Sequence, residues 1–259
     1  RGIDLRTVPG TGPGGLIRRA DVLAVLEGRV PARPAAPAPA AAPAVAEWET
    51  PVPLRGPAAA LAGYMEESLS IPTATSFRTL PVGVLDARRR ELNQALAAAG
   101  RAQKLSYTHL IAWAIVEAVT RWPVMGTAYA LLDGKPHRLE RSVVNLGLAV
   151  DGTRSLLVPV VRDAASLGFA GFVAAYDDLV ARARSGKITV DELRGATVSL
   201  TNPGGLGTVA SLPRLMAGQG TIVATGSIGF PPGLAGADPA RLRELGVEKV
   251  MTVTSTYDH

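Results

Sequence analysis

The feature that most constrains this chain is a segment dominated by alanine and proline, which runs from Val30 to about Pro53. Proline fixes the backbone angle φ and has no amide hydrogen, so such a segment favours extended polyproline II backbone and cannot build a hydrophobic core. We interpret it as a semi-rigid spacer that rises roughly 3 Å per residue where it is extended. It divides the chain into a small module at 1–28, a linker at 29–53 and a large domain at 54–259.

The composition excludes several classes of protein. The chain has 259 residues, of which 47% are hydrophobic, so the large domain can bury a sizeable core. Cysteine is absent, which excludes disulfides, thiolate metal sites and a cysteine nucleophile. The basic residues exceed the acidic ones only slightly and are scattered, which argues against nucleic-acid binding. No apolar run approaches the ~18 residues of a membrane span, and no secretory signal opens the chain, so we expect a cytoplasmic protein.

The large domain mixes amphipathic helices with short β-branched segments. Helical spacing of apolar residues predicts helices that begin near Pro57, Asp86, Ser106 and Phe169. A short helix ended by Gly195 is also expected, with Thr189 and Glu192 as its capping box. Strands are predicted at 143–150, 156–161, 197–201, 221–228 and 250–257. Because helices and strands do not alternate strictly, these segments predict an α/β domain with a mixed β-sheet and helices packed against it.

Two of the predicted strands end in residues suited to acyl chemistry. Val198-Ser-Leu-Thr-Asn-Pro-Gly-Gly-Leu-Gly207 places the hydroxyl of Thr201 before a glycine-rich turn that lacks a phosphate-loop lysine. Thr252-Val-Thr-Ser-Thr-Tyr-Asp-His259 places an imidazole at a strand end. Taken alone, Thr201 could equally be a hydroxyl bonded to its own backbone, and a histidine at a strand end is usually an ordinary residue.

The remaining charged residues carry weaker signals. Arg88, Arg89 and Arg90 are interpreted as a solvated helix face, with an anionic cofactor as the alternative. We interpret His109 as a helix-start residue and His137 as part of a solvated turn. No cluster of histidine, cysteine and acidic residues has ligand spacing, so we predict no metal site.

The two strand-end motifs together resemble the acyltransferase core of the 2-oxo acid dehydrogenase complexes. The resemblance extends to Asn145-Leu-Gly-Leu-Ala-Val-Asp, Leu157-Val-Pro-Val-Val-Arg, Pro213-Arg-Leu-Met and Gly218-Gln-Gly. It is strongest to the succinyltransferase-like segment of actinobacterial multifunctional 2-oxoglutarate dehydrogenase/decarboxylase chains. It implies a chloramphenicol-acetyltransferase-like core.

The resemblance also implies roles for four residues. His259 would be the catalytic base, since a neutral imidazole suits the deprotonation of a thiol whose pKa is about 8.5. Thr201 would donate a hydrogen bond to the oxyanion that develops during acyl transfer. Asp258 and Asn202 would support the site structurally. The arginine that follows this histidine in the family is not in the sequence, so we expect a C-terminally truncated catalytic domain.

The implied reaction moves a succinyl group from dihydrolipoamide to coenzyme A in a 2-oxoglutarate dehydrogenase complex. Succinyl-transferring members usually have threonine at the position of Thr201, and acetyl or branched-chain members more often serine. Coenzyme A would be a substrate, and no cofactor would be bound permanently. No Asp-Lys-Ala hairpin is present, so another domain or chain would supply the lipoate. The family further implies a homotrimer or larger assembly whose active sites lie between subunits.

The small module resembles the peripheral subunit-binding domain of the same acyltransferases. The resemblance rests on a Gly-Thr-Gly-x-x-Gly loop followed by Arg18, Arg19 and an Asp-Val pair, with a short helix at Arg19–Leu26. It implies binding of the dehydrogenase/decarboxylase and dihydrolipoamide dehydrogenase components. The family usually has arginine where this chain has Leu16, so Arg18 and Arg19 become the candidate partner-binding residues. The family's first helix is missing, so we expect an N-terminally truncated module.

The sequence leaves other functions open. One is a trimeric scaffold with little transferase activity of its own, and another is an acetyl or branched-chain acyltransferase. A chloramphenicol-type acetyltransferase would share the fold and chemistry, but the subunit-binding module and the spacer argue against it. A subunit-binding module directly before the core is also unexpected for the actinobacterial fusions.

Overall fold

The computed structural model describes residues 3–12, 16–28, 45–152 and 155–259. The chain divides into two compact units, Arg1–Pro53 and Leu54–His259. Most of the predicted spacer, at 29–44, lies outside the described residues.

The N-terminal unit contains a short 3₁₀ helix, Leu5–Thr7, and helix α1, Arg19–Leu26. Among its described residues, two are buried, Val8 (5% exposed) and Asp21 (2% exposed), so its small centre includes a carboxylate. This carboxylate accepts hydrogen bonds from the Thr11 N–H (3.0 Å), the Thr11 hydroxyl (2.7 Å) and the Arg18 N–H (2.7 Å). One carboxylate therefore fastens the glycine-rich loop to the first turn of α1.

The second unit is a mixed α/β domain, as predicted. Its helices and strands follow in the order α2 (Pro57–Ser68), β1 (Thr73–Pro81), α3 (Gly83–Ala98), α4 (Tyr107–Arg121), β2 (Ala128–Leu132), β3 (Lys135–Leu139), β4 (Leu146–Leu148), β5 (Val150–Asp151), β6 (Leu156–Leu157), β7 (Val160–Val161), α5 (Gly168–Arg184), β8 (Val198–Thr201), β9 (Thr221–Thr225), α6 (Pro239–Glu244) and β10 (Val250–Asp258).

The main sheet has six strands in the order β1-β10-β9-β8-β4-β7. Strands β4, β8 and β9 are parallel, whereas β1, β10 and β7 pair antiparallel with their neighbours. Strand β10 lies between β1 and β9, so both of its edges are hydrogen-bonded. This central position holds the strand that leads to the Asp-His pair.

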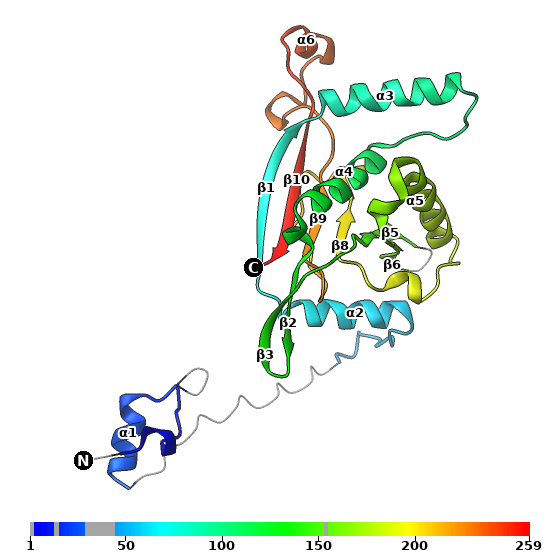
Figure 1. The fold of residues 1–259 in the computed structure, drawn as a ribbon. Coiled ribbons are helices and arrows are strands. Elements are labelled where there is room, and N and C mark those ends of the chain that lie inside the picture. The colour runs from blue at the N-terminus through cyan, green and yellow to red at the C-terminus, as the bar shows by residue number, and fades with distance from the viewer. Residues whose placement is uncertain (1–2, 13–15, 29–44, 153–154) are drawn as a thin grey trace. The chain divides into compact units, whose positions relative to one another are not determined.

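Helices α4 and α5 pack on one face of the central strands (Figure 1). Their buried side chains include Val116 and Phe172, which join Leu146 of β4 and Val198 and Leu200 of β8 in a single apolar cluster. The segment between β8 and β9 lies against β10, where the Thr254 hydroxyl donates to the Ser211 carbonyl at 2.7 Å.

The predicted helices are confirmed, with boundaries shifted by a few residues. Two predicted strands are each divided, because 143–150 contains β4 and the first residue of β5, and 156–161 contains β6 and β7. The helix expected to end at Gly195 is only a 3₁₀ turn, Asp191–Leu193, although Glu192 does accept a hydrogen bond from the Thr189 N–H at 2.9 Å.

Strand β1 and the β2–β3 hairpin were not predicted. Most side chains of β1 are exposed, so the strand has no buried face to produce an alternating apolar pattern. In the hairpin, Asp133 and Gly134 form the turn with positive φ angles of 51° and 72°. The interpretation of His137 as a turn residue is wrong, because it lies within β3 and its backbone opposes Ala130.

Among the described residues, one stretch, Ala164–Arg184, is long and apolar enough to span a membrane by composition alone. The expectation that no run approaches this length was therefore too strict. The stretch contains α5, whose Phe172, Val173 and Leu179 are buried in the domain core. Its charged residues are engaged within the domain, because the Asp177 carboxylate lies 3.0 Å from the His109 Nε2 and Arg182 forms an ion pair with Glu192. These contacts identify it as a core helix.

Candidate active site

Thr201 is the last residue of β8. The three residues before it are buried, and Thr201 itself is partly exposed. No group within the described part of the chain hydrogen-bonds its hydroxyl, so the alternative of a hydroxyl bonded to its own backbone is not observed. The hydroxyl is therefore free to donate to a bound molecule.

The turn after Thr201 is held by Asn202. Its side-chain nitrogen donates to the Thr108 hydroxyl at 2.9 Å, and its oxygen accepts from the Gly204 N–H at 3.2 Å. Gly204 is required for packing, because a Cβ there would lie 2.3 Å from the Gly226 carbonyl oxygen. The glycines thus let two backbone segments approach closely, and Asn202 ties the turn to the start of α4.

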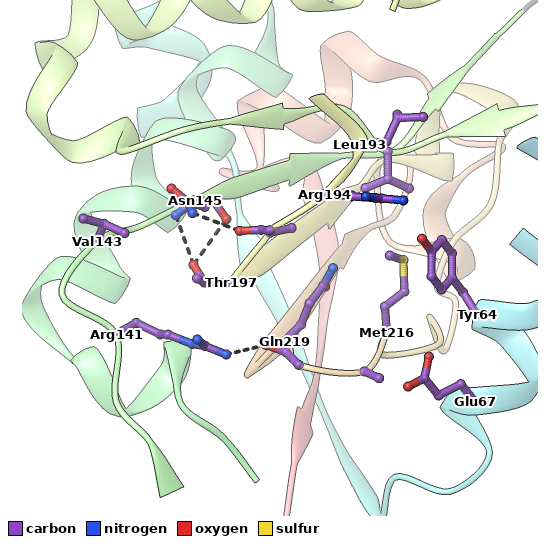
Figure 2. Close-up of a pocket in the computed structure, with 15 residues that line it drawn as sticks. Tyr64, Glu67, Arg141, Val143, Asn145, Leu193, Arg194, Thr197, Met216 and Gln219 are labelled. Carbon is purple, nitrogen blue, oxygen red and sulfur yellow. Dashed lines mark hydrogen bonds between the residues drawn. The ribbon is translucent and has the colours of Figure 1, made fainter. Parts of the chain in front are cut away.

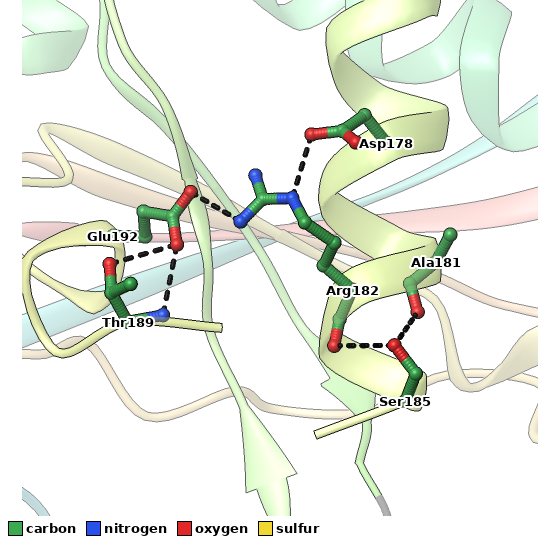
Figure 3. A network of polar contacts seen from close by, with 6 residues as sticks. All are labelled: Asp178, Ala181, Arg182, Ser185, Thr189 and Glu192. Carbon is green, nitrogen blue, oxygen red and sulfur yellow. Dashed lines mark hydrogen bonds and ion pairs between the residues drawn. The ribbon is translucent and has the colours of Figure 1, made fainter. Parts of the chain in front are cut away.

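The start of β8 is fixed by a polar network around Arg182 (Figure 3). Its guanidinium binds Asp178 on the same helix at 2.8 Å and Glu192 at 2.6 Å. The pKa of Glu192 is lowered chiefly by the hydrogen bond from the Thr189 N–H. The network joins the end of α5 to the segment that leads into β8.

A second cluster lies beside Thr108 and was not foreseen. The Tyr107 hydroxyl donates to the Asp86 carboxylate, and the Arg89 guanidinium lies 4.3 Å from the Tyr107 ring centroid. This hydrogen bond is the largest cause of a lowered pKa at Asp86, whereas burial is the main cause of a raised pKa at Tyr107. The expectation of a solvated arginine run is therefore wrong for Arg89, whose side chain is 27% exposed. The sequence did carry one indication of this cluster, because Asp86 and Arg89 are three residues apart and so lie on the same face of a helix.

The Asp-His pair lies at the end of β10. The Asp258 carboxylate accepts from the Tyr129 N–H at 2.7 Å, and its own N–H donates to the Gly220 carbonyl at 3.1 Å. The His259 N–H donates to the Pro72 carbonyl at 3.0 Å. Two backbone N–H groups and one carboxylate therefore hold the strand end, while His259 is exposed in a hollow lined by the β2–β3 hairpin.

Within one chain, Thr201 and His259 lie near opposite ends of the sheet. Thr201 pairs with Ala224 of β9, and Ala224 pairs with Thr254 of β10. His259 follows Thr254 by five residues, a separation of about 16 Å along an extended strand. The structure thus places both residues at exposed strand ends and does not bring them together within one copy.

The third histidine, His109, contributes to packing between helices and is not part of the candidate site. His109 is buried at the start of α4, as expected, where its Nδ1 accepts from the Ser106 N–H at 3.2 Å. Its Nε2 lies 3.0 Å from the Asp177 carboxylate on α5. Both ring nitrogens are occupied and the ring is enclosed, so this pair joins two helices. No cluster of potential metal ligands occurs in the described ranges.

The domain is a mixed sheet covered by helices, with a free hydroxyl at one strand end and an exposed imidazole at another. The chain belongs to the family of 2-oxoacid dehydrogenases acyltransferase (catalytic domain), whose model matches residues 46–259. Residues 1–23 match the e3 binding domain. Both family resemblances predicted from the sequence are confirmed.

Two curated relatives are each 47% identical to this chain. One is the 2-oxoglutarate dehydrogenase E1/E2 component of Corynebacterium glutamicum, matched over 212 residues, and the other is the multifunctional 2-oxoglutarate metabolism enzyme of Mycolicibacterium vanbaalenii, matched over 211 residues. Each match covers 80% of this chain but only 17% of the relative. The chain therefore spans about a sixth of the length of these relatives.

Solved structures share the fold. A probable dihydrolipoamide acetyltransferase of Listeria monocytogenes superimposes with a TM-score of 0.69 at 22% identity, covering 83% of this chain and 87% of that one. A dihydrolipoamide acetyltransferase of Azotobacter vinelandii gives 0.68 at 24% identity, covering 82% and 83%. The fold is thus that of the dihydrolipoamide acyltransferase core, as predicted.

Proposed function

We propose that the unit Leu54–His259 transfers a succinyl group from dihydrolipoamide to coenzyme A. The family match and the names of the relatives, which concern 2-oxoglutarate metabolism, support this choice of reaction and acyl group. Thr201 in place of serine supports succinyl over acetyl and branched-chain groups. Coenzyme A would be a substrate, and the lipoate would come from another domain or chain.

The observation that carries the proposal is the placement of the two motif residues. The Thr201 hydroxyl is unpartnered among the described residues, and the His259 imidazole is exposed, but about 16 Å of strand separates their positions along the sheet. One copy cannot form the site, so we propose that a second copy completes it within a homotrimer. The Azotobacter vinelandii acetyltransferase is described in terms of a serine, a histidine and an asparagine in its catalytic mechanism, which supports pairing a hydroxyl with an imidazole.

The proposed reaction begins when His259 accepts the thiol proton of coenzyme A. The resulting thiolate attacks the thioester carbonyl carbon of succinyl-dihydrolipoamide, and the Thr201 hydroxyl of the neighbouring copy donates to the oxyanion. Collapse of the tetrahedral intermediate breaks the bond to the dihydrolipoamide sulfur, which takes the proton from the imidazolium. Asp258 and Asn202 hold the two strand ends through their bonds to Tyr129 and Thr108.

Steady-state kinetics with succinyl-dihydrolipoamide and coenzyme A test these roles. We expect His259→Ala to abolish transfer and Thr201→Val to lower kcat by about 10²–10³, the usual effect of one oxyanion donor. Because both groups serve one transition state, the double variant should fall little below His259→Ala alone. A folded His259→Ala protein with the original kcat would exclude this enzyme mechanism and favour the scaffold.

Mixed assemblies test whether the site is shared. Neither a His259→Ala chain nor a Thr201→Val chain has full activity, but an interface between them can pair an intact histidine with an intact threonine. Equal mixing should restore about one quarter of the original activity if each interface is head-to-tail. Coexpressed chains that stay at the level of the single variants would exclude a shared site.

The N-terminal unit supports a role in assembly. Leu16, Ile17, Arg18 and Arg19 are all exposed on it, which gives a surface with both apolar and positively charged groups. With the e3 binding domain match, we propose that this surface binds dihydrolipoamide dehydrogenase and the dehydrogenase/decarboxylase component. Such a complex would be cytoplasmic.

A further inference from the structure

The fold contains a second pocket that the proposed chemistry does not use. It has a volume of about 490 Å³ and lies where β4 and β8 begin and where the chain approaches β9 (Figure 2). Arg141, Arg194 and Gln219 line it, and Tyr64 and Glu67 project toward it from α2. The Gly218-Gln-Gly220 motif of the sequence therefore forms part of its wall.

Gln219 is the most informative residue of this pocket. It is only 3% exposed, and its side-chain oxygen accepts a hydrogen bond from the Ser199 hydroxyl at 2.8 Å. This bond leaves the amide nitrogen facing the pocket, and Figure 2 shows it pointing inward. No group among the described residues accepts from this nitrogen. The nitrogen is not enclosed by the protein, so it is open to the pocket and available to donate to a ligand that accepts a hydrogen bond.

The two arginines add positive charge that the protein leaves unpaired. Arg141 donates to the Gly218 carbonyl at 3.1 Å, and its Nε is buried without a hydrogen-bond partner. Neither Arg141 nor Arg194 makes an ion pair with a carboxylate in the described part of the chain. Among the described residues that line the pocket, Glu67 is the single acidic side chain against two arginines, so this lining carries a net positive charge.

Two further polar side chains of the lining, Asn145 and Thr197, are already hydrogen-bonded within the protein, whereas Tyr64 and Glu67 have no polar side-chain partner among the described residues. Asn145 donates to the Gly195 carbonyl at 2.9 Å and accepts from the Asp163 N–H at 2.9 Å. The Thr197 hydroxyl is hydrogen-bonded to the Asn145 backbone. These bonds make a fixed wall, and the donors left for a ligand come mainly from the two arginines and Gln219.

From these contacts we infer that the pocket binds a small carboxylate anion, with Arg141 and Arg194 as charge partners and Gln219 as an amide donor. Guanidinium groups match the planar geometry of a carboxylate. The remaining wall includes Val158 and Met216, which suit the methylene chain of an organic acid better than a fully hydrated phosphate. The inference rests on the pocket itself and does not depend on the transferase proposal.

Calorimetric titration of the 259-residue chain with succinate, succinamide and inorganic phosphate at constant ionic strength tests the ligand class. We expect succinate to bind and neutral succinamide not to bind. Phosphate should bind at least about tenfold more weakly than succinate, because it has no methylene chain to contact Val158 and Met216. Absence of succinate binding, or equal affinity for phosphate, would overturn the inference.

Substitutions locate the binding. Arg194→Gln and Gln219→Glu should each weaken succinate binding by about tenfold or more, since each replaces a donor or adds a repelling charge. The matched control is Arg88→Gln, which removes the same charge from a side chain that is 72% exposed on α3. Arg194 is exposed, so its variant should fold even if Gln219→Glu does not. Equal succinate affinity in Arg194→Gln and Arg88→Gln would overturn the inference.

The carboxylate could belong to an acyl group in transit or to a free organic acid. The chain Gly218–Gly220 offers a connection to the Asp-His strand end, because Arg141 binds the Gly218 carbonyl and the Asp258 N–H binds the Gly220 carbonyl. If Arg194→Gln lowers kcat/KM for succinyl but not acetyl donors, the site serves the acyl group. If Arg194→Gln leaves kcat/KM for succinyl donors unchanged while its affinity for succinate falls, the pocket binds a free acid.

Discussion

The two units of this chain are stabilised in different ways. In the N-terminal unit, the carboxylate of Asp21 binds groups no more than ten residues away in the sequence. In the unit Leu54–His259, the end of β10 depends on Tyr129, which lies 129 residues from Asp258, and the Thr75 hydroxyl binds the Thr256 hydroxyl across 181 residues. The small unit therefore depends on local polar contacts, and the large unit on distant apolar and strand contacts.

Because contacting residues are near in sequence in one unit and distant in the other, the two units should respond differently to pH and to substitutions. A local polar centre should be sensitive to pH and to one charged residue, and it should fold without the rest of the chain. A non-local apolar core should be sensitive to lost volume and insensitive to mild acid.

The largest expected effect is that of limited proteolysis, which should separate the two units completely. The composition of residues 30–53 predicts that limited proteolysis cleaves there and leaves a stable fragment that begins near Leu54. Mass spectrometry of the products identifies the boundary. A protease-resistant fragment that spans this segment would contradict the proposed division into 1–28, 29–53 and 54–259.

Removal of a buried aromatic ring should affect only the unit Leu54–His259. Phe172 is fully buried between α5 and the sheet, so Phe172→Ala should lower the free energy of unfolding by about 3–5 kcal/mol. Thermal unfolding followed by circular dichroism measures the loss. The amide spectrum of the N-terminal unit serves as the control, and a change there would show that the units are not independent.

Loss of one charge should affect only the N-terminal unit. The pKa of Asp21 is lowered by hydrogen bonds from the Arg18 N–H, the Thr11 N–H and the Thr11 hydroxyl, in that order. Its stabilisation is therefore complete above the unfolded pKa of about 3.9 and is lost as the pH falls through the lower folded value. We expect Asp21→Asn to unfold this unit at neutral pH and to remove its acid transition, as NMR can measure. Asp4→Asn, at an exposed position, is the control.

The smallest expected effect concerns partner association. Replacing Arg18 and Arg19 with glutamate should slow association with dihydrolipoamide dehydrogenase, because exposed charges act mainly on the association rate. Surface plasmon resonance at two salt concentrations measures the rate. Arg6→Glu tests charge alone, since that side chain is 91% exposed in the same unit. An equal effect of Arg6→Glu would argue against a specific surface.

Much of the architecture could be predicted because its causes are local. The apolar spacing of 106–122 and 169–184 specified α4 and α5, and β-branched residues specified β8 and β10. The motifs around Thr201, Asn202, Asp258 and His259 also identified the family, since they lie within short runs of sequence. The Asp133-Gly134 turn carried a hairpin signal as well, but the strands beside it have too little buried surface to show alternation.

The tertiary structure decided which distant residues meet. The sequence does not relate Tyr107 to Asp86, His109 to Asp177 or Gln219 to Ser199, because each contact depends on the packing of separate elements. It also could not place Thr201 and His259 at opposite ends of one sheet, because that separation follows from the pairing of β8 with β9 and of β9 with β10. Residue types and short spacings are local properties of a chain, whereas strand order and helix packing arise from the burial of the whole apolar surface.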